Sequence, residues 1–201
     1  MDTITISKIY SKYTHFYDYL FGRILAQGRY KAIQLMNPQP GEKILEVGIG
    51  TGVSLPSYPR YSRVVGIDIC WEMLEKARRI KLSLGLSNVS LYRMDAERLA
   101  FANGRFDKVI AAYVITVVPN SARAIMEMKR VCKKEGEIFV LNYFGSKDGV
   151  LSNAISSIRE KLGLGKPLNP EKILEDANLK ILEIHRVNFL NLFHLIRCKN
   201  A

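Results

Sequence analysis

The sequence predicts an α/β fold built on a doubly wound, mainly parallel sheet. From Glu42 onward, short runs of strand type alternate with segments whose apolar residues recur at helical spacing, as in sheets whose parallel strands are connected by helices. A glycine-rich turn, residues 48–52, follows the first of these runs. The chain ends with two strand-like runs joined tightly through residues 188–191. Such a hairpin at the end of a parallel sheet leaves one strand antiparallel.

The expected elements alternate along the chain. Strand-like runs cover residues 43–49, 63–69, 89–94, 106–115, 136–144, 181–187 and 192–198. Helical spacing covers residues 6–24, 71–84, 121–132, 150–162 and 171–177. Ser121 is the expected N-cap of its helix, because a serine hydroxyl can accept a hydrogen bond from the first turn.

The composition sets bounds on partners and compartment. The 201 residues suffice for one domain with a well-covered core. A net charge of +11 suggests an anionic partner such as nucleic acid, anionic lipid or an acidic substrate, although a lysine-rich surface alone would also account for it. Three separate cysteines without a CxxC pair predict neither a disulfide framework nor a metal site. We expect no signal peptide and no membrane span, and therefore a cytoplasmic protein whose membrane contact is peripheral.

The segment LEVGIGTG carries the clearest chemical signal. A strand ends at Glu46, and Gly48, Gly50 and Gly52 follow at alternate positions. Glycines at such a turn let the backbone approach a ligand closely. The next strand ends at Asp68, about 20 residues further on, where a carboxylate can bind ribose hydroxyls. Together these features predict a nucleoside cofactor at the carboxyl ends of the strands.

The glycine spacing and the acid before it favour S-adenosylmethionine over a dinucleotide. Dinucleotide sites use GxGxxG and place a pyrophosphate on a helix N-terminus, whereas this turn reads GxGxG and follows the carboxylate of Glu46. That carboxylate would repel a pyrophosphate and attract a sulfonium and an amino group. Asp95, at the end of a third strand, is suited to bind the adenine amino group. A tight turn without a ligand is the alternative, but three acids at strand ends favour cofactor binding.

These motifs resemble those of the class I S-adenosylmethionine-dependent methyltransferases. The segments EVGIGTG, GIDI and MDAE look like the successive cofactor motifs of that family. More narrowly, FYDYLFG, SLPSYP and YVITVVPN are similar to segments of the bacterial (Rhodobacter-type) phosphatidylethanolamine N-methyltransferases, and the likeness runs over nearly the whole chain. The resemblance implies a Rossmann-like, seven-stranded, mostly parallel sheet with an antiparallel last strand. It implies S-adenosylmethionine as the cofactor and no metal.

The resemblance also implies roles for particular residues. The cofactor-binding residues that it indicates are Tyr17, Glu46, Gly48, Gly50, Gly52, Asp68, Ile69, Met73, Asp95, Ala96, Glu97, Tyr113 and Val114. Asp68 would bind the ribose hydroxyls, and Asp95 and Ala96 would contact the adenine. Tyr113 and Val114 would lie near the transferred methyl group.

Two positions depart from the family pattern. Cys70 stands where the family has a serine, and we interpret it as a small buried hydrophobe rather than a reactive thiol. Tyr143, after Asn142, stands where the family has a histidine. If that histidine assists catalysis elsewhere in the family, Tyr143 must replace it.

The N-terminal segment combines a tyrosine stripe with a basic flank. On a helix over residues 6–24, Tyr10, Tyr13 and Tyr17 share one face, and the opposite face carries cations. Buried tyrosine hydroxyls need partners, and a sulfonium and a lipid amine would supply them. We therefore expect Tyr10 and Tyr17, together with Tyr143, to be catalytic. The cations would let the helix lie on an anionic membrane.

The expected organisation is an amphipathic helical lid and membrane-contact segment, residues 1–36, followed by a methyltransferase domain, residues 37–201. The expected activity is N-methylation of phosphatidylethanolamine, and of its methylated derivatives toward phosphatidylcholine, at the membrane surface. One alternative is a quinone-ring or other small-molecule C- or O-methyltransferase, and another is a non-catalytic cofactor-binding protein that contacts RNA or a partner. No nucleic acid partner is expected, because AAYVITVVPN lacks the Pro-Pro-aromatic loop of nucleobase methyltransferases.

Overall fold

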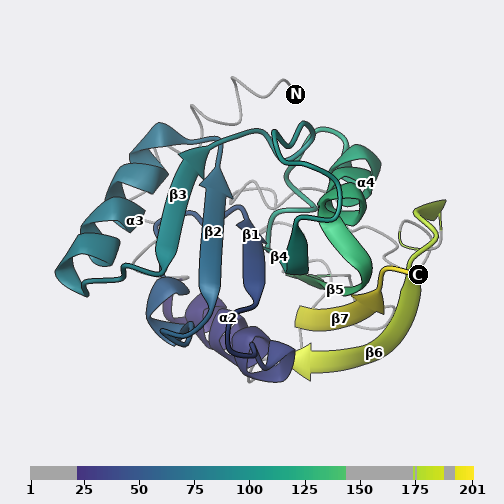
Figure 1. Ribbon diagram of the computed structural model, residues 1–201, viewed down its shortest axis with the longest axis horizontal. Helices are drawn as coiled ribbons and strands as arrows, with labels where there is room; N and C mark the ends of the chain where they lie inside the picture. The colour runs from purple at the N-terminus through teal and green to yellow at the C-terminus, as the bar shows by residue number, and fades with distance from the viewer. Residues whose placement is uncertain (1–21, 144–173, 175, 188–192) are drawn as a thin grey trace, which may run out of the picture.

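The structure, a computed structural model, describes residues 22–143, 174, 176–187 and 193–201. Its elements are α2 (Gly22–Met36), β1 (Lys43–Val47), η1 (Leu55–Ser57), β2 (Arg63–Asp68), α3 (Trp71–Ser83), β3 (Val89–Arg93), β4 (Phe106–Ala112), α4 (Ser121–Val131), β5 (Cys132–Tyr143), β6 (Lys180–Val187) and β7 (Phe193–Lys199). The strands form a seven-stranded sheet in the order β3-β2-β1-β4-β5-β7-β6 (Figure 1).

The sheet is parallel except at its last strand. β1 pairs in parallel with β2 and β4, β2 pairs with β3, and β4 pairs with β5. β7 runs antiparallel to both β5 and β6, so the predicted doubly wound sheet with an antiparallel last strand is confirmed. The strand order reverses between β1 and β4, and ligands of such sheets bind in the crevice at the carboxyl ends of these strands.

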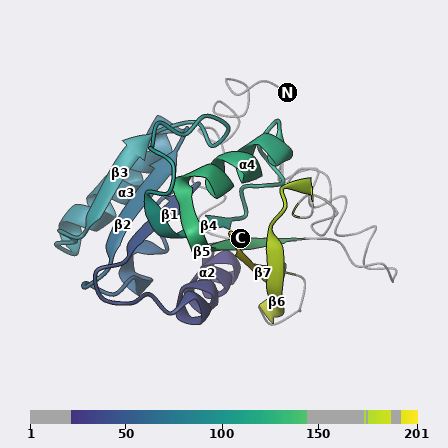
Figure 2. The ribbon, with the colours of Figure 1, turned by 45° about the vertical axis from the view of Figure 1, so that its right-hand side comes forward.

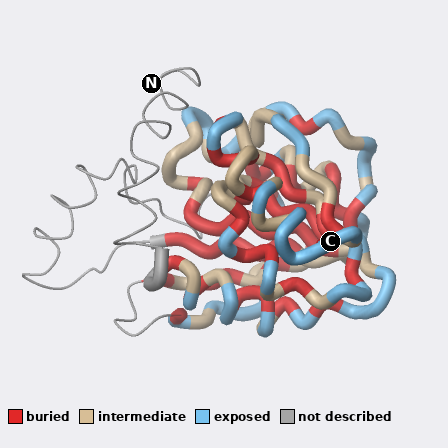
Figure 3. The backbone as a smooth tube through the Cα atoms, turned by 90° about the vertical axis from the view of Figure 1, so that its left-hand side faces the viewer, coloured by how far each residue is buried: buried red, intermediate tan, exposed pale blue. Residues whose placement is uncertain are grey.

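Helices cover both faces of the sheet. α2 and α3 bury apolar residues on one face, among them Leu25 and Leu74. α4 buries Ile125 on the other face. Successive strand residues alternate between the two layers, as Ile44 and Leu45 of β1 do. Figure 2 shows α2 and α4 on opposite sides of the strands, and Figure 3 shows the buried strands enclosed by exposed connections.

A buried lysine fixes the C-terminal end of α2. Asn37, with φ +45°, turns the chain out of the helix, and Pro38 cannot continue it. Lys108 of β4 donates hydrogen bonds to the carbonyl oxygens of Met36 (2.9 Å) and Asn37 (3.1 Å) and pairs with Glu42 at 3.0 Å. The last carbonyls of a helix lack partners within it, so Lys108 attaches α2 to β4 and positions the residues that α2 brings to the site.

The start of α4 differs from the expectation. Asn120, and not Ser121, is the N-cap, because its side chain accepts a hydrogen bond of 3.0 Å from the N–H of Arg123. The hydroxyl of Ser121 instead donates to the carbonyl oxygen of Ile115 at 2.8 Å. The prediction was wrong because two good capping residues are adjacent, and tertiary contacts rather than propensity choose between them.

Further along the chain, β5 begins directly after α4, earlier than predicted, through an irregular pairing with β4.

The expected helices over 6–24, 150–162 and 171–177 fall wholly or mostly outside the described residues. Within the part of the chain that is described, no helix has the length and hydropathy needed to cross a bilayer.

Candidate functional site

The turn after β1 needs glycine for two different reasons. Gly48 and Gly52 have φ of +72° and +81°, in the left-handed region that glycine favours. A Cβ at Gly48 would lie 1.9 Å from a methyl carbon of Val114, and one at Gly52 would lie 2.9 Å from Ala77 of α3. At Gly50, φ is +57° and the space where a Cβ would point is open. Gly48 and Gly52 therefore permit close packing, and Gly50 presents bare backbone to the site.

Asp68, at the end of β2, is held by backbone N–H groups of the two neighbouring turns. One carboxylate oxygen accepts a hydrogen bond from Gly50 N and the other accepts one from Cys70 N, both at 2.9 Å. Burial raises the pKa of Asp68, and these hydrogen bonds oppose that shift. Each carboxylate oxygen has a second lone pair, so the side chain can still accept hydrogen bonds from ligand hydroxyls.

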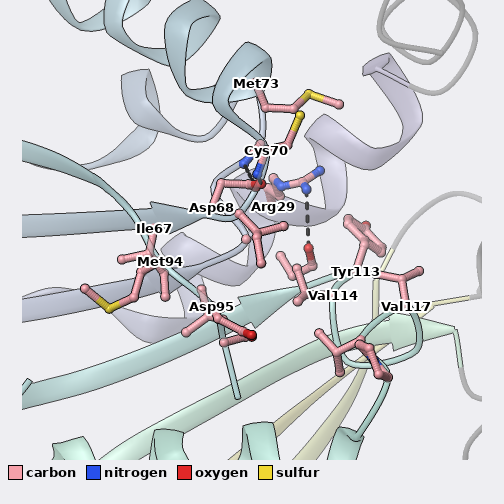
Figure 4. Close-up of a pocket in the computed structure, with 18 residues that line it drawn as sticks. Arg29, Ile67, Asp68, Cys70, Met73, Met94, Asp95, Tyr113, Val114 and Val117 are labelled. Atoms are coloured by element: carbon pink, nitrogen blue, oxygen red, sulfur yellow. Dashed lines mark hydrogen bonds between the residues drawn. The ribbon is translucent and has the colours of Figure 1, made fainter. Parts of the chain in front are cut away.

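A pocket opens at the carboxyl ends of β1, β2 and β4 (Figure 4). The residues that line it are Arg29, Val47, Gly48, Gly50, Ile67, Asp68, Ile69, Cys70, Met73, Met94, Asp95, Ala96, Ala112, Tyr113, Val114, Val117, Val118 and Pro119. Among these described lining residues, the charged side chains are Asp68, Asp95 and Arg29. The pocket thus combines apolar walls with two acids and one cation.

The structure brings together many of the residues expected to bind the cofactor. Those that line the pocket are Gly48, Gly50, Asp68, Ile69, Met73, Asp95, Ala96, Tyr113 and Val114. Glu46, Gly52 and Glu97 lie near it without lining it. Tyr10, Tyr17 and the side chain of Tyr143 lie outside the described residues, so their roles stay predictions.

Glu46 is buried beside the pocket and makes its hydrogen bonds elsewhere. Its carboxyl oxygens accept hydrogen bonds from Ser54 Oγ (2.9 and 2.8 Å) and from the Tyr58 hydroxyl (2.8 Å). Burial raises the pKa of Glu46, whereas the nearby charge of Arg29 and the two hydroxyls lower it. Glu46 therefore ties the glycine-rich turn to the η1 segment, and its charge interacts with those of Arg29 and Asp68.

Glu97 and Asp95 organise the loop after β3. Asp95 accepts a hydrogen bond from Glu97 N at 2.9 Å, and Glu97 accepts one from Asn120 N at 2.7 Å. Asp95 and Ala96 face the pocket. Glu97 instead attaches this loop to the start of α4.

Cys70 lies between Asp68 and α3, with 2% of its surface exposed. Burial raises the pKa of its thiol to about 11, and the thiol donates a hydrogen bond to Glu72 at 3.1 Å. A protonated thiol is a poor nucleophile. This environment agrees with our interpretation of Cys70 as a buried, unreactive residue.

Arg29 of α2 was not predicted as a site residue, and the fold brings it to the pocket from outside the βα motifs. Its guanidinium lies 4.9 Å from the ring centre of Tyr113 and donates a hydrogen bond of 3.3 Å to the carbonyl oxygen of Ala112. Gly28 lets the helix come this close, because a Cβ there would lie 2.1 Å from the Tyr113 hydroxyl. The signal in the sequence that could have indicated this site residue is the glycine directly before it, because a glycine within a helix can mark a close approach to another element.

Comparison with known proteins adds a decisive observation. The chain is 34% identical to a phosphatidylethanolamine N-methyltransferase of Cereibacter sphaeroides over an alignment that covers 98% of each chain. A family described as a methyltransferase domain matches residues 45–140. The chain belongs to the S-adenosylmethionine-dependent methyltransferase family. This methyltransferase is also 31% identical to a ubiquinone/menaquinone biosynthesis C-methyltransferase of Pseudomonas paraeruginosa, over 83% of this chain and 66% of the other.

Solved structures agree on the fold of the methyltransferase. A crystal structure of an S-adenosylmethionine-dependent methyltransferase from Aquifex aeolicus superposes with a TM-score of 0.70 at 20% identity, covering 100% of both chains.

The pocket of this methyltransferase fits its cofactor. Asp68 and Asp95 are acceptors suited to ribose hydroxyls and an adenine amino group, and the apolar walls suit the adenine ring. The open backbone at Gly50 is a cradle that a side chain would fill. Among the described residues, no group of three or more His, Cys, Asp or Glu side chains could hold a metal ion.

Proposed function

We propose that this methyltransferase methylates the amine head group of phosphatidylethanolamine, and then its methylated derivatives, at a membrane surface. The observation that carries the proposal is the 34% identity to a phosphatidylethanolamine N-methyltransferase over 98% of both chains. That similarity extends beyond residues 45–140, the part matched by the general methyltransferase family. Parts of the chain outside the cofactor motifs therefore resemble the lipid enzyme as well.

Methyl transfer from a sulfonium requires an oriented cofactor and a reacting centre shielded from water, and residues that line the pocket can supply both. Bound S-adenosylmethionine supplies an electrophilic methyl group on a sulfonium. Asp68 and Asp95 would orient the adenosine, and Val114, Val117 and Val118 would exclude water from the reacting end of the pocket. Water exclusion and fixed orientation favour an in-line displacement.

The attacking amine must lose its proton before it can accept a methyl group. Its pKa resembles that of lysine, about 10, so the ammonium form dominates at neutral pH. Cys70 is not suited as the base, because its thiol has a pKa of about 11 and is itself protonated. Tyr10, Tyr17 and Tyr143 are our candidates for accepting the proton or stabilising the cation. Replacing Tyr17 by Phe tests the hydroxyl, since unchanged kcat and KM would remove it from this role.

The proposed membrane contact lies in the basic N-terminal segment, residues 1–36, and the part of it that precedes α2 would act as a lid over the cofactor, because α2 itself packs on the sheet. Its support is the sequence pattern of tyrosines on one helical face and cations on the other. Binding to anionic vesicles should then weaken as salt rises. Deleting residues 1–24 should abolish vesicle binding and activity together, and full activity without them would refute the lid.

A quinone-ring C-methyltransferase is the second candidate, because one relative of that function covers 83% of this chain. The two candidates are separated by giving the purified protein labelled S-adenosylmethionine with vesicles that contain both phosphatidylethanolamine and an unmethylated quinone precursor. The proposal predicts label in the phospholipid fraction. Label confined to the quinone fraction would replace the proposal with the second candidate, and bound cofactor without transfer to either would favour a non-catalytic protein.

A further inference from the structure

We propose that the guanidinium of Arg29 binds the carboxylate at the methionine end of S-adenosylmethionine, and so selects the cofactor against adenosyl thioethers that lack a carboxylate. The proposal rests on the identity of the cofactor and is independent of the methyl acceptor. Figure 4 shows Arg29 at the pocket, with a dashed hydrogen bond from its guanidinium.

Arg29 has hydrogen-bonding capacity that the described residues do not use. A guanidinium carries five N–H donors, and here one of them makes a hydrogen bond of 3.3 Å, to the carbonyl oxygen of Ala112. Its Nε is buried and has no hydrogen-bond partner among the described residues. A buried donor on a charged group is costly to leave unpaired. A carboxylate would satisfy it, because two oxygens match the fork of the guanidinium.

Two acids whose charges interact with that of Arg29, Glu46 and Asp68, do not bind its guanidinium in the described part of the chain. The charge of Arg29 acts to lower the pKa of both Glu46 and Asp68 against the raising effect of burial, and Asp68 lines the same pocket as Arg29. Glu46 nevertheless accepts its hydrogen bonds from hydroxyls, and Asp68 accepts its own from backbone N–H groups. Neither acid forms an ion pair with Arg29 within the described part of the chain. The positive charge is therefore balanced through space, and the described residues leave donors of the guanidinium available to a ligand.

S-adenosylmethionine offers one group of the charge that the guanidinium of Arg29 attracts. S-adenosylmethionine carries one anionic group, its carboxylate, and two cationic groups. Among the described residues that line the pocket, Arg29 is the one cation. Among the described lining residues, the carboxylate therefore has one side chain of opposite charge to bind.

The position of the guanidinium is fixed before the cofactor binds. The face of the Tyr113 ring lies 4.9 Å from it, an arrangement that attracts a cation. Gly28 allows α2 to approach Tyr113, and Lys108 holds the end of the helix. A side chain that is already ordered loses little entropy on binding.

The test measures affinity by titration calorimetry with two ligands that differ by the carboxylate alone. These are S-adenosylhomocysteine and its decarboxylated form, S-adenosyl-3-thiopropylamine. In the unmodified protein the carboxylate should tighten binding about tenfold to a hundredfold. In Arg29→Gln this preference should fall to a few-fold, while the Kd of the decarboxylated ligand changes little. Arg29→Lys should keep part of the preference, because an ammonium retains the charge without the fork.

Arg78→Gln is the matched control, since Arg78 stacks on exposed Trp71 and does not line the pocket. It should keep the full preference for the carboxylate. Equal weakening of both ligands in Arg29→Gln would overturn the proposal, because Arg29 would then act on the shape of the pocket. An unchanged preference would overturn it as well. If Arg29→Gln fails to fold, Arg29→Lys is the test. A preference for the carboxylate as large as in the unmodified protein would contradict binding by the two-pronged guanidinium. These binding measurements do not depend on lipid methylation, so the proposed function can fail while the proposal for Arg29 holds, and the reverse.

Discussion

The hydroxyl of Tyr58 donates a hydrogen bond of 2.8 Å to Glu46, and both side chains are buried. This pairing explains why the acid of the glycine-rich motif does not line the pocket. Ser54 and Tyr58 supply the hydrogen bonds that a buried carboxyl group requires. Glu46 thus joins β1 to the segment after the turn, and the turn presents its backbone to the cofactor.

The stability contribution of Glu46 should depend on pH. Burial raises its folded pKa above the ordinary value of 4.5, so folding favours the protonated form. The stability that results is present at acidic pH and is lost as the pH rises through the raised pKa. Glu46→Gln lacks this ionisation. The free energy of unfolding of the unmodified protein, minus that of Glu46→Gln, should therefore fall as the pH rises from the ordinary carboxyl range toward neutrality. Urea unfolding across this range measures it, and a constant difference would show that Glu46 has no raised pKa.

Asp68→Asn should weaken the binding of S-adenosylhomocysteine by at least about tenfold. The amide nitrogen cannot accept the hydrogen bond that Gly50 or Cys70 now donates to a carboxylate oxygen. It also removes an acceptor for a ribose hydroxyl. Calorimetry measures the loss, and Asp176→Asn, at an exposed position, is the control. Equal affinity of Asp68→Asn and the unmodified protein would exclude Asp68 from the cofactor site.

The thiol of Cys70 should resist alkylation in the folded protein although it borders the pocket. Its pKa is raised to about 11, and those of Cys132 and Cys198 are raised to about 12. Little thiolate is then available near neutral pH. Mass spectrometry after iodoacetamide treatment should find all three cysteines labelled in urea and little label without it. Rapid labelling of Cys70 in the folded state would mean that it is a reactive residue.

Lys108→Met should destabilise the protein by about 2 kcal/mol, because it leaves two helix-end carbonyls and Glu42 without their partner. Methionine keeps the apolar stem, so the loss reports the ammonium group. Lys31→Met, at an exposed position of α2, should change the free energy of unfolding by less than about 0.5 kcal/mol. Similar urea midpoints for both variants would show that Lys108 does not anchor the helix.

The sequence predicted those features that depend on local pattern. The strand runs, the glycine-rich turn and the acids at the ends of β2 and β3 all lie within short βα units, where spacing along the chain sets spacing in the structure. Asp68 and Asp95 were found for this reason, and both line the pocket.

Other features depend on contacts between distant segments and could not be predicted in this way. Arg29 reaches the pocket because α2 packs beside Tyr113, 84 positions further along the chain, and its own helix gives no sign of this. Lys108 is buried in a strand because its ammonium group meets the end of α2. The partners of Glu46 lie 8 and 12 positions away, across a turn whose path propensity does not specify.

The most direct test of the central claim follows the methyl group from cofactor to lipid. The purified protein is incubated with methyl-labelled S-adenosylmethionine and vesicles of phosphatidylethanolamine mixed with an anionic phospholipid, and the extracted lipids are analysed by mass spectrometry. We predict labelled head groups that carry one or more added N-methyl groups, with a matching amount of S-adenosylhomocysteine. The same vesicles with Asp68→Asn should give much less product. A folded protein that binds the cofactor and leaves every phospholipid unlabelled would contradict the proposed function.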